Sequence, residues 1–341
     1  MPRHSVLAAI VLSLSLSLSL LLPASLEAEA AECPYPKPVV LAGLNWESGM
    51  FTTEVLRVLL EKGYGCKTDV LPGNTLTMEN ALRQNDIQVI AEQWAGRSEL
   101  WRKAEAAGEV FAVGEPVKGA TEGWWVPDYL VKGEGAPAAG LRSVSDLPRF
   151  KALFKDPESP DKGRFYNCPT GWTCEGVNSQ KLKAYGLEDS YVNFRTGTGP
   201  ALDAAISSAI RQRQPILFYY WSPTPLMGRY QLVQLEEPPF DQKAWETLID
   251  PSNPKPIGTR SLPAKIAIGV SRDLREKAPP LVQAFEKLEI PLPLFNGILA
   301  RMAEEHAEAA PMADAFYRQH RDIWAQWVPA EVALRIDASL K

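Results

Sequence analysis

The chain has 341 residues, of which 45% are hydrophobic and 23% charged, a composition typical of a folded globular protein and not of a disordered one. Its formal net charge is −5 and no basic run opposes that balance, which argues against a nucleic-acid partner. Even without its apolar N-terminus the chain is longer than one hydrophobic core usually serves, so we expect two lobes.

The N-terminus has the pattern of a secretory signal peptide. Arg3 and His4 precede a run from 5 to 22 that is almost wholly apolar residues and Ser, and the small-x-small sequence at 28–30 follows. This order predicts export, with residues 1–30 removed by cleavage near Ala30 and a periplasmic mature protein. The alternative is an N-terminal membrane anchor, because the apolar run is close to the lower length limit for a span.

The first part of the mature chain alternates strands and helices. Apolar runs and helical spacing predict a strand at 38–44, a helix at 48–62, a strand at 67–71, a helix at 75–84, a strand at 87–92 and a helix from Ser98. This βαβαβ order is typical of a mostly parallel sheet with right-handed crossovers.

From Gly119 the pattern changes and predicts a second α/β lobe. We expect a strand at 124–130, a loop at 133–140, a helical unit at 143–154, a polar turn at 156–163, a helix at 176–185, a strand at 191–195, a helix at 201–213, a strand at 215–220 and a proline-rich linker at 251–263. A strand at 265–270 then returns to the first lobe, and a mainly helical tail follows from 279.

The predicted lobes are therefore discontinuous in sequence. Lobe 1 comprises residues 31–118 and 264–341, and lobe 2 comprises residues 119–263. In such a protein a ligand lies between the lobes, at the carboxyl ends of the strands.

The four cysteines are an even set in a chain that we expect to be exported, which is consistent with two disulfides. Four cysteines allow three pairings. The short spacing favours Cys168–Cys174, which leaves Cys33–Cys66. The latter two each precede a predicted strand, and neighbouring parallel strands would bring them together. A zinc site is the alternative, but no histidine lies nearby, so we expect no metal.

The segment 167–176, Asn-Cys-Pro-Thr-Gly-Trp-Thr-Cys-Glu-Gly, is the most informative in the chain. A tryptophan on a covalently closed loop is pre-positioned, as the wall of a binding site should be. The loop opens the helix predicted from Gly176, so the backbone N–H groups of Thr173 and Cys174 are placed to bind an anion.

Four tryptophans share one structural position in this prediction. Trp46 follows the first strand, Trp94 the third, Trp172 lies on the disulfide loop, and Trp221 follows the strand that ends at Tyr220. A quaternary ammonium has no N–H group to donate, but aromatic faces attract it by roughly 0.5–2 kcal/mol each. The pattern therefore predicts an aromatic site for a methylated cation, against the alternative of ordinary core packing.

The disulfide-loop motif closely resembles the family of exported substrate-binding proteins of glycine betaine/proline betaine ABC transporters. The resemblance continues at Gln93-Trp94, at Leu-Lys-Ala-Tyr (182–185) and at Phe-Tyr-Tyr-Trp-Ser-Pro (218–223), and it spans the mature chain in order. It implies a type II periplasmic-binding-protein fold, with two α/β lobes around a ligand cleft. It also implies a monomer that works with an ABC permease and an ATPase.

The resemblance assigns roles to individual residues. Trp94, Trp172 and Trp221 match the family's cage around the trimethylammonium group, and the backbone amides of Thr173 and Cys174 match its binding site for the ligand carboxylate. The sequence Asn-Trp-Glu-Ser at 45–48 looks more like the choline-binding branch, in which the first-loop tryptophan forms a fourth wall and a nearby acid meets the hydroxyl group.

These matches leave several alternatives open. Trp46 would be the fourth wall, and Glu47 either meets a ligand hydroxyl or acts as an acid at a helix N-terminus. Arg97 departs from the family pattern, and we expect it to be solvated, the alternative being contact with a ligand carboxylate. We expect Trp124 and Trp125 to pack at the crossover between the lobes, with one ring as a possible wall of the cleft.

Two other classes of function compete with a transport protein. An enzyme is disfavoured because the motif-bearing region contains no histidine and no nucleophile elbow, so we expect neither catalysis nor a cofactor. A sensor that reports to a membrane kinase would use the same pocket. The sequence does not rank glycine betaine, proline betaine, choline, carnitine and dimethylsulfoniopropionate as ligands.

Overall fold

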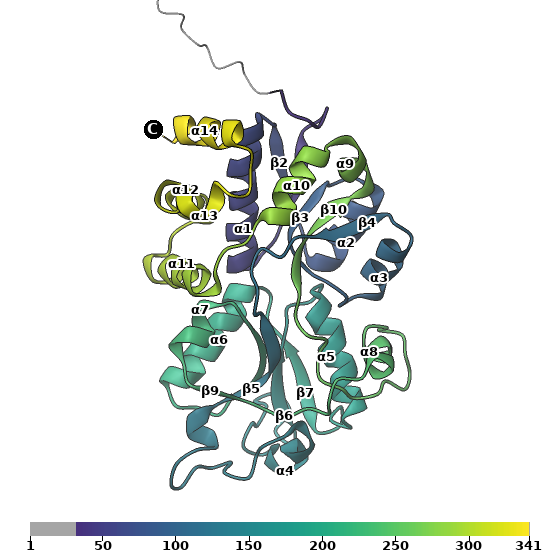
Figure 1. Ribbon diagram of the computed structural model, residues 1–341. Coiled ribbons are helices and arrows are strands. Elements are labelled where there is room, and N and C mark those ends of the chain that lie inside the picture. The colour runs from purple at the N-terminus through teal and green to yellow at the C-terminus, as the bar shows by residue number, and fades with distance from the viewer. Residues whose placement is uncertain (1–31, 341) are drawn as a thin grey trace, which may run out of the picture. The chain divides into compact units, whose positions relative to one another are not determined.

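The computed structural model describes residues 32–340, and Figure 1 shows their course. The predicted signal peptide and its cleavage position lie outside the described residues. Among residues 32–340, no helix is both long enough and apolar enough to cross a membrane.

The first sheet has five strands in the order β2-β1-β3-β10-β4 (Figure 1). They are β1 (Val39–Gly43), β2 (Thr68–Pro72), β3 (Val89–Trp94), β4 (Val110–Val113) and β10 (Ile266–Ser271). Strand β1 runs parallel to β2 and β3, whereas β10 runs antiparallel to β3 and β4.

The second sheet repeats this pattern in the order β7-β6-β8-β5-β9. Its strands are β5 (Thr121–Pro127), β6 (Gly163–Asn167), β7 (Tyr191–Arg195), β8 (Leu217–Ser222) and β9 (Leu232–Gln234). Strand β6 is parallel to β7 and β8, and β5 is antiparallel to β8 and β9. The chain thus enters the second sheet with β5 and returns to the first with β10.

Helices cover the sheets. Those before the second sheet are α1 (Glu47–Val58), its π-helical continuation η1 (Leu59–Gly63), α2 (Thr75–Gln84) and α3 (Glu99–Ala106). Between β5 and β10 in the sequence lie η2 (Asp128–Leu130), η3 (Val144–Asp146), α4 (Leu147–Phe150), α5 (Thr173–Ala184), α6 (Gly199–Arg211), α7 (Pro225–Arg229) and α8 (Gln242–Leu248). Those after β10 are α9 (Arg272–Lys277), α10 (Pro279–Lys287), α11 (Leu292–Glu305), α12 (Ala309–Gln319), α13 (Arg321–Trp324) and α14 (Ala330–Ser339).

The C-terminal helices complete the core on the first sheet. They gather beside α1 in Figure 1, and a single buried cluster joins them to the sheet. At its centre the ring of Phe51 lies 5.5 Å from that of Phe295 and 6.2 Å from that of Phe316, both edge to face. The C-terminal helices therefore bury the apolar face of α1.

The structure corrects several predicted elements. In each sheet four strands run in the same direction, as predicted. Both sheets are nevertheless mixed, because the one strand that arrives from the other sheet, β10 or β5, runs antiparallel to its two neighbours. The sequence prediction also omits β4, α8 and β6. In β6 the residues Gly163, Phe165 and Asn167 are buried. Glycine and asparagine have low strand propensity, which hides this strand in the sequence.

Two predicted boundaries are also wrong, whereas the first predicted helix is confirmed to within one residue at each end. Helix α5 begins at Thr173 and not at Gly176, so the disulfide loop already contains its first turn. Strand β8 continues to Ser222, which places Trp221 inside the strand and not after it. The helix predicted at 48–62 is α1 followed by the π-helical turn η1.

A buried carboxyl group ties α2 to the end of the first sheet. Glu79 is 1% exposed and accepts hydrogen bonds from Gln93 Nε2 at 2.8 Å and from the hydroxyl of Ser98, which caps α3. Burial raises the pKa of Glu79 from 4.5 to about 7, although these hydrogen bonds oppose the rise.

This pKa predicts a pH dependence of stability. Because the folded pKa is raised, the stabilising contribution is complete below about pH 4.5 and is lost as the pH rises to about 7. The loss should amount to roughly 3 kcal/mol. In urea unfolding, the difference between the wild type and Glu79→Gln should therefore change by about this amount between those pH values. A difference that stays flat with pH would contradict the assignment.

Candidate functional site

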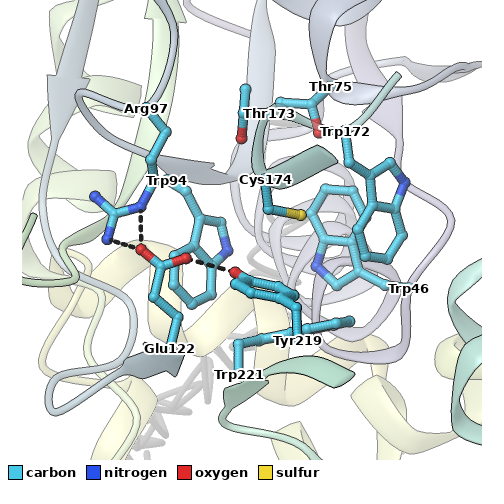
Figure 2. Close-up of a pocket in the computed structure, with 10 residues that line it drawn as sticks. All are labelled: Trp46, Thr75, Trp94, Arg97, Glu122, Trp172, Thr173, Cys174, Tyr219 and Trp221. Carbon is cyan, nitrogen blue, oxygen red and sulfur yellow. Dashed lines mark hydrogen bonds and ion pairs between the residues drawn. The ribbon is translucent and has the colours of Figure 1, made fainter. Parts of the chain in front are cut away.

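One pocket brings together side chains from both sheets (Figure 2). Its empty volume is ≈ 370 Å³, including some open solvent. The lining is mainly aromatic and consists of Trp46, Thr75, Trp94, Arg97, Glu122, Trp172, Thr173, Cys174, Tyr219 and Trp221. The four tryptophans singled out in the sequence therefore face a shared cavity.

Each tryptophan lies at the carboxyl end of a strand or at the start of the helix that follows. Trp46 is the N-cap residue of α1, and Trp172 that of α5. Trp94 is the last residue of β3, and Trp221 is the penultimate residue of β8. Because strands β1, β3, β6 and β8 end at the cavity, residues far apart in sequence meet there.

Three of the four rings contact one another in a chain that joins the two sheets. Trp172 lies edge-on to Trp46 at 5.0 Å and edge-on to Trp221 at 5.4 Å. Two glycines leave room for this arrangement. A Cβ atom at Gly49 would lie 2.8 Å from the Trp46 ring, and one at Gly199 would lie 3.0 Å from the Trp172 ring.

The position of Trp172 is further fixed by polar contacts. Its indole N–H donates to Asn45 Oδ1 at 2.9 Å, a residue of the other sheet's first loop. The preceding Gly171 has φ +88°, and a Cβ atom there would also lie 2.4 Å from the side chain of Asn74. Only glycine satisfies both conditions at this turn.

Beneath the disulfide loop lies a buried polar network that the sequence analysis missed. Asn167 Oδ1 accepts from the backbone N–H of Cys168 at 2.7 Å and from Asn178 Nδ2 at 3.0 Å. Asn178 in turn accepts from the indole of Trp124 at 2.8 Å. Both asparagines are at most 1% exposed, so these bonds fix the loop against the sheet.

The disulfides are Cys168–Cys174 and Cys33–Cys66, and together they use all four cysteines. The first closes the loop that carries Trp172, and Cys174 lines the pocket. The second joins the segment before β1 to the segment before β2. Within residues 32–340, no group of three His, Cys, Asp or Glu side chains is placed to hold a metal ion.

The first turn of α5 points toward the pocket through two of its residues. Thr173 and Cys174 are the first helical residues and both line the cavity. The N–H groups of a helix's first turn have no partner within the helix, and the helix dipole favours an anion there. The pocket therefore combines aromatic faces with a helix N-terminus.

Behind two of the tryptophans lies a carboxylate that the sequence analysis also missed. Glu92 in β3 is 2% exposed, and its Oε1 accepts from the indole N–H groups of Trp46 at 2.8 Å and Trp94 at 2.9 Å. The hydroxyl of Ser48 donates to the same oxygen at 3.1 Å. One acidic side chain thus orients both rings that the first sheet contributes. The only feature of the sequence that could have indicated this role is that Glu92 is an acidic residue within a mostly apolar predicted strand.

The opposite part of the pocket contains a buried ion pair. Arg97 is 3% exposed and Glu122 is 6% exposed by side chain, with Nη2 and Oε1 2.7 Å apart. The second carboxylate oxygen accepts from the hydroxyl of Tyr219 (Figure 2). Burial, followed by the charge of Glu122, raises the pKa of Tyr219 well above 10. The prediction that Arg97 is solvated is therefore wrong, because Glu122 on β5 pairs with it.

The remaining sequence candidates lie outside the lining. Glu47 is the first residue of α1 and half-buried, and burial raises the pKa of its carboxyl group. Trp124 is fully buried and packs 4.2 Å from the ring of Phe165. Trp125 donates to the carbonyl of Tyr220 at 3.1 Å. Neither of these two indoles is part of the cavity wall.

The ion pair predicts a non-additive effect on stability. Arg97→Met should destabilise the protein by about 3–5 kcal/mol, since it leaves Glu122 buried and unpaired. The double variant Arg97→Met/Glu122→Gln should be more stable than the single one. Urea unfolding of the two variants and the wild type checks this. A double variant less stable than Arg97→Met would contradict the pairing.

Two β-sheets with helices around them contribute aromatic side chains to one pocket. This arrangement is typical of a substrate-binding protein. The chain belongs to the OpuAC family, described as the substrate binding domain of the ABC-type glycine betaine transport system, whose model matches residues 37–319. The family predicted from the sequence is thus confirmed, as is its class, a binding protein of a transport system and not an enzyme.

Three known proteins illustrate the likeness. The glycine betaine-binding periplasmic protein OusX of Dickeya dadantii is 25% identical over 240 residues, which is 67% of this chain and 68% of OusX. The glycine/betaine/L-proline-binding protein ProX from Borrelia burgdorferi has a TM-score of 0.72 at 19% identity, over 88% of this chain and 100% of ProX. An ABC-transporter choline binding protein in complex with choline has a TM-score of 0.71 at 16% identity, over 89% and 98%. These structures confirm the predicted type II periplasmic-binding-protein fold.

Proposed function

We propose that this protein binds glycine betaine, or a related zwitterion with a methylated onium group, and presents it to a membrane permease that an ATPase drives. The observation that carries the proposal is that four indoles, contributed by the segments around both sheets, line one pocket. Their faces would surround the onium group, and the backbone amides of Thr173 and Cys174 would bind the carboxylate.

The same pocket argues for a zwitterion over choline. The helix N-terminus of α5 offers a place for an anionic group, which choline lacks. Trp46 as a fourth wall is a feature in common with the choline-binding branch. For Glu47, the position in the first turn of α1 supports the role of a helix N-terminal acid and not a ligand contact.

The proposed mechanism is closure without chemistry. We propose that lobe 1 (31–118 and 264–341) and lobe 2 (119–263) open in water and close on the ligand, since each contributes rings to its cage. Support comes from the chain's passage between the two sheets at β5 and β10. We further propose that the protein is exported to the periplasm and acts there as a monomer. The signal-peptide pattern of residues 1–30 supports export, as does the similarity to OusX, whose name describes a periplasmic protein.

A tryptophan substitution tests the cage. Trp172→Ala should weaken binding of glycine betaine at least about tenfold, because it removes an aromatic face and the edge contacts to two others. Isothermal titration against glycine betaine, proline betaine, choline, carnitine and dimethylsulfoniopropionate gives the affinities and ranks the ligands.

Trp125→Ala is the control, since Trp125 is a partly buried tryptophan of the second sheet that does not line the pocket. Its affinity should stay within threefold of the wild type. If Trp172→Ala also stays within that range, Trp172 is not in the binding site. A wild-type protein that binds none of the five compounds would refute the proposed function.

Loss of either disulfide should lower stability, but only one of the two should also lower affinity. The bridge Cys33–Cys66 closes a loop of sequence separation 33 and Cys168–Cys174 one of 6. By loop entropy, replacing the first pair with alanine should cost roughly 4 kcal/mol of stability and replacing the second roughly 2 kcal/mol. Affinity should fall only for the second pair, because that loop carries Trp172. Calorimetric titration with glycine betaine and thermal unfolding of both variants test this. Equal losses of affinity in the two variants would contradict a role of the Cys168–Cys174 loop in binding.

A further inference from the structure

Glu92 has an unusual distribution of hydrogen bonds. Its three hydrogen-bond donors among residues 32–340, the indoles of Trp46 and Trp94 and the hydroxyl of Ser48, converge on Oε1. Within residues 32–340, the buried Oε2 has no hydrogen-bond partner. A carboxyl group that is 2% exposed and half satisfied is costly unless something else compensates it.

The charged side chains around the pocket do not supply that compensation. The cation that lines the pocket, Arg97, is held by Glu122 on β5 and by the carbonyls of Ala95 and Leu262. The charge that acts on Glu92 from α1 is Glu47, which has the same sign. Burial raises the pKa of Glu92, and the hydrogen bonds from Trp94, Trp46 and Ser48 oppose that rise.

We infer that Glu92 is the buried counter-charge of the ligand's onium group and acts on it through the indoles of Trp46 and Trp94. This inference rests on the proposed function. An indole that donates its N–H to a carboxylate is polarised toward its ring face, which strengthens the attraction of that face for a cation. The same two hydrogen bonds fix the ring planes, so Glu92 positions the cage as well as charging it.

The arrangement gives the site a preference for cations without an acid in the cavity wall. A carboxylate in direct contact with the onium group would itself have to be desolvated for each binding event. Glu92 is buried by side chains of the protein itself and is held in place by three donors. The carboxylate of Glu92 is therefore desolvated when the protein folds and not when the ligand binds. On binding, the onium group is stabilised by this negative charge.

The test uses Glu92→Gln, which keeps an acceptor oxygen for the indoles and removes the charge. Its affinity for glycine betaine should fall at least tenfold. Its affinity for 3,3-dimethylbutanoate, in which carbon replaces the ammonium nitrogen, should change by less than threefold. The matched control is Glu79→Gln, since Glu79 is equally buried beside the same sheet but contacts no indole. Both affinities of that control should stay within threefold of the wild type.

Each result decides the inference. If Glu92→Gln binds glycine betaine within threefold of the wild type, or loses both ligands equally, Glu92 is no counter-charge. A wild type that binds no onium compound refutes the proposed function instead, so the two failures are distinguishable.

A second measurement is independent of the folding of Glu92→Gln. In the proton–nitrogen spectrum of the ligand-free wild type, the indole signals of Trp46 and Trp94 should lie downfield of those of Trp125 and Trp324, which donate to backbone carbonyls. Signals of Trp46 and Trp94 within the carbonyl-bonded range would overturn the inference.

Discussion

The contact of Trp172 with Trp46 is the interaction on which the site depends. It joins the disulfide loop of the second sheet to the first loop of the other sheet at 5.0 Å, and the hydrogen bond from Trp172 to Asn45 fixes its direction. Without it the rings would belong to two separate surfaces. Neighbouring features are arranged around this contact, since Gly49 and Gly199 leave space for the two indoles and Gly171 allows the turn before Trp172.

A second constraint is that buried polar groups need partners. In the aromatic cluster the indole N–H groups of Trp46 and Trp94 share Glu92, and that of Trp172 uses Asn45. A tryptophan whose N–H is bonded at a fixed point has its ring plane fixed as well. The cage is therefore held rigid by polar contacts behind it and not only by packing of its faces, which explains why acids and amides lie in buried positions next to the pocket.

The sequence predicted the fold class and the family because these follow from local signals. The spacing of Cys168 and Cys174 around a tryptophan, and apolar runs that end at Trp94 and Trp221, are visible without any contact information. Glu92 and the pairing of Arg97 with Glu122 were not predictable in this way. Both depend on which side chains face each other across strands, and a charged residue in a sequence is ordinarily solvated. The strand β6 was missed because it is short and bounded by glycine and asparagine.

The charges of the site follow from its two halves. On one side Arg97 and Glu122 neutralise each other, so this pair contributes hydrogen bonds and shape but no net field. On the other side Glu92 has three donors and no cation, while the N-terminus of α5 carries the positive end of a helix dipole. A ligand with a positive group and a negative group separated by a short linker matches these two poles. In the proposed function, the backbone amides of α5 and the carboxylate of β3 are the two poles that orient a bound zwitterion.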